Sequence, residues 1–196
     1  MKHRLVFVVT HPTTAWHLLR GQLSFLDANG FDVTVISSPG PELQRVADRE
    51  RVRVVPVSMS RDVRLSEGPA ALLSLTRELR ALRPHIVNAS TPKAGLLGMI
   101  AARSLSVPVR VYLLRGLRLE GATGLARVAL GGAEWLTARC AHEVVCVSES
   151  LKKVVVKRGY ALERKITVLP SNGVDIGRFR ERAETRAECE RVRREL

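Results

Sequence analysis

The residues whose types and spacing suggest chemistry lie between Pro84 and Gly121. Thr91 followed by Pro92 is typical of a helix start, because threonine can cap and proline suits the first helical position. Lys93 then falls in the first turn, where unpaired backbone N–H groups and the helix dipole favour an anion. The pair Arg115-Gly116 follows the next apolar run and places a guanidinium fork beside a residue that lets a ligand approach the backbone. These residues predict an anion-binding site, and the alternative is a plainly capped helix and a turn with solvated side chains.

Other polar side chains stand where strands are predicted to end, which is where open parallel sheets bind their ligands. They are Thr13, Thr14, Ser37, Ser38, Ser90, Glu120, Ser148, Glu149, Asn172 and Asp175. His11 follows the first predicted strand and is a candidate base, the alternative being a turn residue without a catalytic role.

Several common kinds of site are excluded because their motifs are missing. The turn after the first predicted strand, His11-Pro12-Thr13-Thr14, has no glycine, so we expect no G-x-G-x-x-G dinucleotide site there. The sequence has no Walker A motif, no acidic residues after the first strand for a phosphoacceptor, and no G-x-S-x-G elbow. Its three cysteines show no paired spacing. We therefore expect free thiols in a reducing cytoplasm, no metal and no cofactor.

The formal net charge of +13 comes mostly from arginines scattered along the chain. Either it is a solvated surface, or it indicates an anionic partner such as an acidic membrane surface or a phosphate-bearing substrate. We expect no nucleic acid, because no binding motif is present and an aromatic content of 4% leaves few stacking platforms. No apolar run approaches the roughly 20 residues of a transmembrane helix, and the run near the amino terminus is too short for a signal peptide.

Apolar runs and helical periodicity predict the elements that position these residues. We expect strands over 4–10, 31–36, 52–57, 85–89, 109–114, 142–147 and 165–169. We expect helices over 15–28, 41–50, 69–83, 92–105, 123–141 and 148–159, with a kink or interruption at Gly131-Gly132. Small residues at Ala94, Gly95, Gly98 and Ala101 would let the fourth helix lie close to a sheet. This alternation predicts an α/β, Rossmann-like, doubly wound and mostly parallel sheet with helices on both faces.

A set of motifs in fixed order resembles the amino-terminal domain of family 4 glycosyltransferases. The motifs are SSPGPEL, VSMSR, SLTRELRALRPHIVNASTPKAGLLGMIAA, YLLRGLRLEG, EWLTARCAHEVVCVSESL and LPSNGVDIGRF. Within the family they are most similar to bacterial capsule, exopolysaccharide and lipid-linked oligosaccharide transferases. The resemblance implies one half of a two-lobed GT-B fold, with an acceptor-binding domain over 4–179 and a charged helix or linker over 180–196 that leads towards a donor domain.

The resemblance also implies a reaction: retaining transfer, usually without a metal, from a nucleotide-sugar (a UDP-sugar is expected) that the carboxy-terminal lobe binds. The acceptor would be a glycan or a sugar on a lipid diphosphate at the inner, cytoplasmic face of an anionic membrane, where the protein would bind peripherally. By this likeness Lys93 and Arg115 would contact the diphosphate or acceptor. Further acceptor- or phosphate-binding candidates are Thr13, Thr14, Thr91, Gly116, Glu120, Ser148 and Asn172.

The catalytic base is left unassigned. Many relatives of this kind carry an important histidine near the position of Arg115-Gly116, and arginine stands here, so His11 and Arg115 are the remaining catalytic candidates. The donor domain is not in the sequence, so we expect no transfer by this chain alone, with a separate donor-domain chain as a further candidate partner. Two alternatives stay open: a non-catalytic GT-B-like half that acts as a binding or scaffold subunit, and a GT-B nucleotide-sugar epimerase, which would bind UDP through this half alone.

Overall fold

The computed structural model describes residues 2–59, 68–117, 121–169 and 190–194. The strands are β1 (His3–Val8), β2 (Phe31–Ser37), β3 (Arg53–Pro56), β4 (Ile86–Ser90), β5 (Val109–Leu114), β6 (Glu143–Cys146) and β7 (Ile166–Val168). The helices are α1 (Pro12–Leu18), α2 (Gln22–Ala28), α3 (Pro41–Glu50), α4 (Gly68–Leu82), α5 (Pro92–Ser104), α6 (Gly124–Cys140) and α7 (Glu149–Lys157), with a 3-10 turn at Glu163–Lys165. Each predicted strand is present, with ends shifted by at most two residues.

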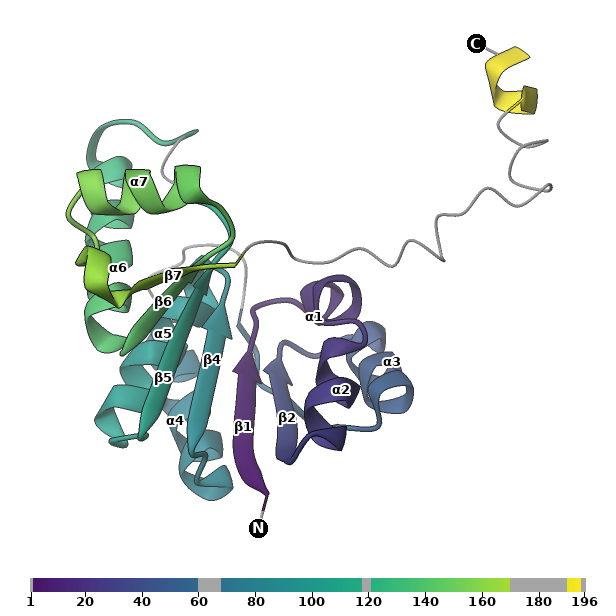
Figure 1. The fold of residues 1–196 in the computed structure, drawn as a ribbon. Coiled ribbons are helices and arrows are strands. Elements are labelled where there is room, and N and C mark those ends of the chain that lie inside the picture. Colours follow the sequence, from purple (N-terminus) through teal and green to yellow (C-terminus); the bar gives the residue numbers. More distant parts are fainter. Residues whose placement is uncertain (1, 60–67, 118–120, 170–189, 195–196) are drawn as a thin grey trace.

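The strands form one sheet in the order β3-β2-β1-β4-β5-β6-β7, and each neighbouring pair is parallel. Helices cover both faces, with α1 to α3 packed on one side and α4 and α5 on the other (Figure 1). The predicted doubly wound α/β fold is therefore confirmed, and the sheet is parallel throughout the described residues.

The packing of strand β1 on both faces of the sheet explains why its sequence is almost entirely apolar. Leu5 and Phe7 pack in the cluster that includes α1, α2 and α3, whereas Val6 and Val8 pack in the cluster that includes α4 and α5. A strand with helices on both faces has no solvated side, so it lacks the apolar–polar alternation of a half-exposed strand.

Helix α5 lies so close to β5 that one helix position has no room for a side chain. A Cβ at Gly95 would stand 2.5 Å from Cε2 of Tyr112. Tyr112 is itself fixed, because its hydroxyl donates a hydrogen bond of 2.8 Å to the buried carboxylate of Glu134 on α6. Burial raises the pKa of Glu134, and burial together with the nearby carboxylate raises that of Tyr112 well above its usual range.

The sequence indicated one helix over 15–28, and this prediction is wrong, because the structure has two helices separated at Gly21. The carboxylate of Glu50 on α3 accepts hydrogen bonds from the backbone N–H groups of Gly21 at 3.0 Å and Ser24 at 3.2 Å. It also accepts one of 2.7 Å from Arg49, whose guanidinium lies 3.9 Å from the ring centroid of Trp16. The Glu50 carboxylate, which is distant in sequence, therefore caps the amino terminus of α2, and a new helix begins after Gly21.

Three further expectations can be compared with the structure. Helix α6 runs without interruption through Gly131-Gly132, where a kink or break was expected, and Gly131 packs against Tyr160, since a Cβ there would stand 3.0 Å from the tyrosine hydroxyl. Cys140 and Cys146 are buried free thiols, as expected. The proposed segment 180–196 falls mostly outside the described residues, of which 190–194 are helical.

We predict that Gly95→Ala lowers the free energy of unfolding by about 2 kcal/mol, because the added methyl group must displace a well-packed ring. The matched control is Gly132→Ala in α6, where a Cβ would meet no atom within 4 Å. That variant should gain up to about 1 kcal/mol through helix propensity. Urea unfolding measures both, and equal effects of the two variants would contradict the close approach of α5.

We predict that Glu50→Gln lowers the free energy of unfolding at pH 7 by about 2 kcal/mol, the usual contribution of hydrogen bonds to a charged group. Burial alone would raise the pKa of Glu50, but hydrogen bonds from Gly21, Arg49 and Ser24 outweigh it and hold the pKa below its ordinary value of 4.5.

The stabilisation by Glu50 is therefore complete above the unfolded-state pKa and is lost as the pH falls through the lower folded-state pKa. The difference between wild type and Glu50→Gln, measured by urea unfolding from pH 7 downwards, should shrink in that acidic window. Glu42→Gln on the same helix is the control, and a difference that stays constant to the acid limit would be inconsistent with this cap.

Candidate functional site

The order of the sheet reverses between β1 and β4, which are neighbours in space although β2 and β3 lie between them in sequence. From β1 the chain proceeds outward to β2 and β3, and from β4 it proceeds outward in the opposite direction (Figure 1). In open α/β sheets, ligands bind outside the carboxyl ends of the strands at such a reversal. The residues that follow β1, β4 and β5 therefore define the candidate site, which we call the switch-point site.

Two threonine hydroxyls join the strands at this reversal. Oγ1 of Thr10, after β1, lies 2.6 Å from Oγ1 of Thr91, after β4. Oγ1 of Thr91 also accepts a hydrogen bond of 3.2 Å from the backbone N–H of Thr10. Oγ1 of Thr10 accepts one of 3.2 Å from the backbone N–H of Ala94 in the first turn of α5. The end of β1 thus caps the helix that follows β4.

The sequence indicated Thr91 as the side-chain cap of α5, and this part of the prediction is wrong. Thr91 occupies the N-cap position, but its side chain makes no capping hydrogen bond to the helix and is turned to Thr10 instead. Its φ of 73° is unusual for a β-branched residue and costs conformational energy. A strained backbone held by surrounding contacts at the end of a strand is a feature that functional sites often share.

Lys93 is the second residue of α5 and is half-buried. The next N–H groups of the first turn are used within the chain: Ala94 donates to Thr10, and Gly95 donates to the carbonyl of Thr91 at 2.7 Å. Pro92 has no N–H. The helix end therefore offers fewer backbone donors than the sequence suggested, and the ammonium group of Lys93 is the main positive feature at this point.

His11 caps α1 and is oriented by Thr13. Its Nδ1 lies 2.8 Å from the Thr13 hydroxyl and accepts a hydrogen bond of 3.4 Å from the backbone N–H of that residue. Because Nδ1 accepts, the proton of the neutral ring is on Nε2. His11 in this arrangement can donate a hydrogen bond to a ligand, whereas its lone pair is engaged by Thr13. Thr14 lies one residue further along α1 and is half-buried.

Arg115 directly follows β5, beside the end of β4. Its Nε is buried and has no hydrogen-bond partner in the described part of the chain. Burial lowers the pKa of its guanidinium below the ordinary value, although an arginine remains charged at neutral pH. Gly116 is exposed, and a Cβ there would meet nothing within 4 Å, so the position is open to a ligand but does not require glycine.

Ser148 and Ser38 lie further from the reversal, and three other predicted residues lie outside the description. Ser148 caps α7 by accepting a hydrogen bond of 3.2 Å from the N–H of Leu151, and it follows β6, two strands from β4. Ser38 exchanges two hydrogen bonds of 3.0 Å with the backbone of Met59 near the end of β3. Glu120, Asn172 and Asp175 lie outside the described residues.

Sequence reasoning missed Thr10, because a threonine at the end of an apolar run resembles a final strand residue. Its role depends on α5, which lies more than eighty residues later, so no local spacing reveals it. The structure brings His11, Thr91, Lys93 and Arg115 to one edge on three neighbouring strands. In the described ranges, no cluster of three or more side chains could hold a metal ion. The switch-point site thus presents hydrogen-bond donors and positive charge, which suit an anionic ligand.

Comparisons with known proteins agree with this architecture. The sequence profile of Glycosyltransferase Family 4 matches residues 17–178. The capsular polysaccharide biosynthesis glycosyltransferase CapM of Staphylococcus aureus is 38% identical over 182 residues, which are 91% of this chain and 47% of CapM. The UDP-Gal:α-D-GlcNAc-diphosphoundecaprenol α-1,3-galactosyltransferase of Escherichia coli is 29% identical over 160 residues, 81% of this chain and 41% of that enzyme. The chain spans about half the length of the curated relatives it matches.

Solved structures share the fold at low sequence identity. Anabaena HepE in complex with UDP and glucose superposes with a TM-score of 0.71 at 15% identity, covering 93% of this chain and 47% of HepE. A UDP-N-acetylglucosamine 2-epimerase structure from Listeria monocytogenes has a TM-score of 0.65 at 13% identity, covering 85% of this chain and 44% of the epimerase chain. At these identities the solved structures show the fold alone, whereas the sequence profile shows the family.

Proposed function

This chain belongs to glycosyltransferase family 4, and from that premise we propose that it is the acceptor-binding half of a glycosyltransferase of capsule or lipid-linked glycan synthesis. The observation that carries the proposal is the donor-rich, positively charged edge at the β1/β4 reversal, in a chain whose profile match covers residues 17–178. The resemblance further implies transfer with retention of the anomeric configuration.

The donor would be a UDP-sugar bound by the second lobe of the two-lobed architecture. Two comparisons support this choice: a relative from Escherichia coli is named for a UDP-galactose reaction, and HepE was solved with UDP and glucose. The switch-point site would then face the donor across the cleft between the lobes. In this arrangement the chain supplies acceptor binding, and transfer requires the donor lobe on the same or a separate chain.

The acceptor would carry a diphosphate between its sugar and a lipid. Lys93 and Arg115 provide positive charge at the ends of neighbouring strands, and His11 provides an Nε2–H donor on the next strand. Guanidinium and ammonium groups are the usual protein partners of phosphate oxygens. The relative from Escherichia coli is named for an acceptor of this chemistry, GlcNAc-diphosphoundecaprenol.

We predict that this chain binds a short-lipid analogue of a GlcNAc diphosphate acceptor and that Lys93→Gln weakens binding about ten-fold, the effect of removing one charged hydrogen-bond donor. Lys153→Gln is the matched control, because Lys153 is an exposed lysine on α7, away from the reversal. Isothermal titration calorimetry measures each affinity.

The same calorimetry with UDP separates the candidate functions. The acceptor-binding half should bind the acceptor analogue and not UDP, and it should transfer no sugar by itself. UDP binding by this chain would favour an epimerase, and equal acceptor affinity in the two lysine variants would remove Lys93 from the site.

We also propose that the protein docks on the anionic inner face of the cytoplasmic membrane through α6. Leu125 is 89% exposed and Val128 72% exposed, and Leu136 lies three turns beyond Leu125 on the same side of the helix. Arg127 lies between them, and the sequence from 121 to 133 has no acidic residue. Helix α6 begins at the edge where the strands end (Figure 1), so docking there would bring a lipid-linked acceptor near the switch-point site.

Docking through α6 fits a protein that lies on a membrane rather than across it. In the described ranges, no helix is both long and apolar enough to span a bilayer.

We predict that phosphatidylglycerol vesicles sediment the protein at low salt and that binding weakens as salt rises, because exposed charges are screened. Leu125→Ser/Val128→Ser should weaken binding about ten-fold through lost apolar burial. The control Leu73→Ser/Leu162→Ser changes two other exposed apolar residues, on α4 and after α7. Binding that is insensitive to salt, or equally weakened in both double variants, would refute docking through α6.

A further inference from the structure

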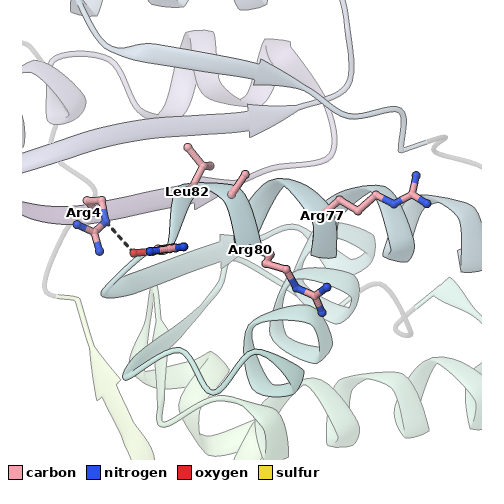
Figure 2. Close-up of a pocket in the computed structure, with 6 residues that line it drawn as sticks. Arg4, Arg77, Arg80 and Leu82 are labelled. Atoms are coloured by element: carbon pink, nitrogen blue, oxygen red, sulfur yellow. Dashed lines mark hydrogen bonds between the residues drawn. The ribbon is translucent and has the colours of Figure 1, made fainter.

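An arginine-rich depression lies at the opposite edge of the sheet. Strands β1 and β4 begin at this edge and α4 ends there (Figure 1). It has a volume of about 720 Å³ and is lined by Arg4, Arg77, Arg80, Ala81, Leu82 and Arg83. Figure 2 shows Arg4 at one end of the row of labelled residues and Arg77 at the other, with Leu82 and Arg80 between them. We call this the arginine depression.

The charges of the arginine depression are not balanced by the described part of the chain. No carboxylate lines it, and none of its four arginines takes part in an ion pair there. Two carboxylates adjoin the arginines in register or sequence: Asp32 on β2 is the register partner of Arg4, and Glu78 follows Arg77 on α4. Neither forms an ion pair with the arginines. Gathering like charges without a counter-ion is unfavourable, so an anion at this place would be stabilising.

His85 lies beside the depression and contacts Arg4, which lines it. Nδ1 of His85 accepts a hydrogen bond of 3.0 Å from the backbone N–H of Arg4, so its Nε2 carries a proton in either charge state. Nη2 of Arg4 lies 3.3 Å from that Nε2. An arginine nitrogen has no free lone pair, so with Nδ1 engaged by the Arg4 backbone two N–H groups meet at this contact. The imidazole is held against the Arg4 guanidinium and adds a nitrogen donor beside it, which favours an oxyanion at this end of the depression.

One hydrogen bond and the spacing of the arginines on α4 determine where their guanidinium groups lie. Nε of Arg4 donates a hydrogen bond of 2.7 Å to the carbonyl oxygen of Arg83, which holds one end of the row in place (Figure 2). Arg77 and Arg80 are three residues apart on α4, which corresponds to about 4.5 Å along the helix. Arg83 follows the end of the helix with a left-handed backbone, at a φ of 46°. One phosphate group can engage one or two guanidinium forks, whereas this row offers several in succession.

We propose that the arginine depression is a second binding site, for a multivalent phosphate, separate from the switch-point site. The ligand chemistry is two or more linked or neighbouring phosphate groups, each accepting hydrogen bonds from a guanidinium, with one phosphate at the Arg4 end, beside His85. Such a ligand could be a soluble polyphosphate-type compound or clustered lipid phosphates. The two sites lie at opposite ends of the strands, so both can be occupied together. The proposal does not depend on the proposed transferase function.

The first arm of the test uses a soluble probe, inorganic triphosphate, followed by NMR at the ring protons of His85 and the backbone amides of α4. Wild type should show saturable shifts at both places. Arg77→Gln/Arg80→Gln should weaken this binding at least about ten-fold, as expected for the loss of charged hydrogen bonds. The control Arg45→Gln/Arg158→Gln removes the same charge from exposed positions on α3 and after α7 and should leave the affinity within two-fold.

The second arm uses vesicles of phosphatidylglycerol with the same variants. Triphosphate binding that only Arg77→Gln/Arg80→Gln weakens supports the site and identifies a soluble source. Vesicle binding that only this variant weakens, without saturable triphosphate shifts, supports the site and identifies a lipid source. The proposal is overturned if triphosphate leaves the His85 ring unshifted and vesicle binding is unaffected by the variant, or if both double variants lose binding equally, since that result reflects net charge alone.

Discussion

The position of the switch-point site depends on how closely α5 lies against the sheet. A Cβ at Gly95 would stand 2.5 Å from Tyr112, and one at Gly98 would stand 3.0 Å from the Cβ of Ala89. Glycine at both places lets the helix backbone pack directly on the Tyr112 ring of β5 and on the Ala89 methyl group of β4. Since Lys93 is in the first turn of the same helix, this packing sets where its ammonium group lies relative to the ends of the strands.

Much of the architecture could be predicted because burial on two faces leaves a clear pattern in sequence. The apolar runs over 31–36 and 109–114 correspond to β2 and β5, and small residues in 94–101 indicated the close approach of α5. Because parallel strands place their carboxyl ends at one edge, the polar residues after these runs were expected to gather. Lys93 and Arg115 do follow neighbouring strands, so the placement of the candidate site followed from pattern and topology together.

The features that could not be predicted depend on contacts between residues distant in sequence. Glu50 ends the expected long helix by accepting hydrogen bonds at Gly21 and Ser24, more than twenty residues earlier. Thr91 fits the local signature of a cap, but a nearby hydroxyl from β1 competes successfully for its side chain. Arg4 joins the arginines at the end of α4 only because β1 and β4 are neighbours in the sheet. Local propensity describes a segment in isolation, and these side chains respond to the fold.

The donors and carboxylates near the switch-point site limit which proton transfers this edge of the sheet can carry out. At the switch-point edge, His11 is held with Nδ1 engaged and Nε2 protonated, so the neutral ring is a donor. The sequence from Arg4 to Leu26 has no carboxylate, and from Pro84 to Ala133 its single carboxylate is Glu120. Within these two segments the described residues can orient and neutralise an anionic acceptor but provide no carboxylate base, and the described carboxylates that start helices at this edge are Glu42 on α3 and Glu149 on α7. In a transfer that needs such a base at this edge, Glu120 or a residue beyond these segments would have to accept the proton, and the arrangement of donors around Lys93 would act by holding the acceptor in place.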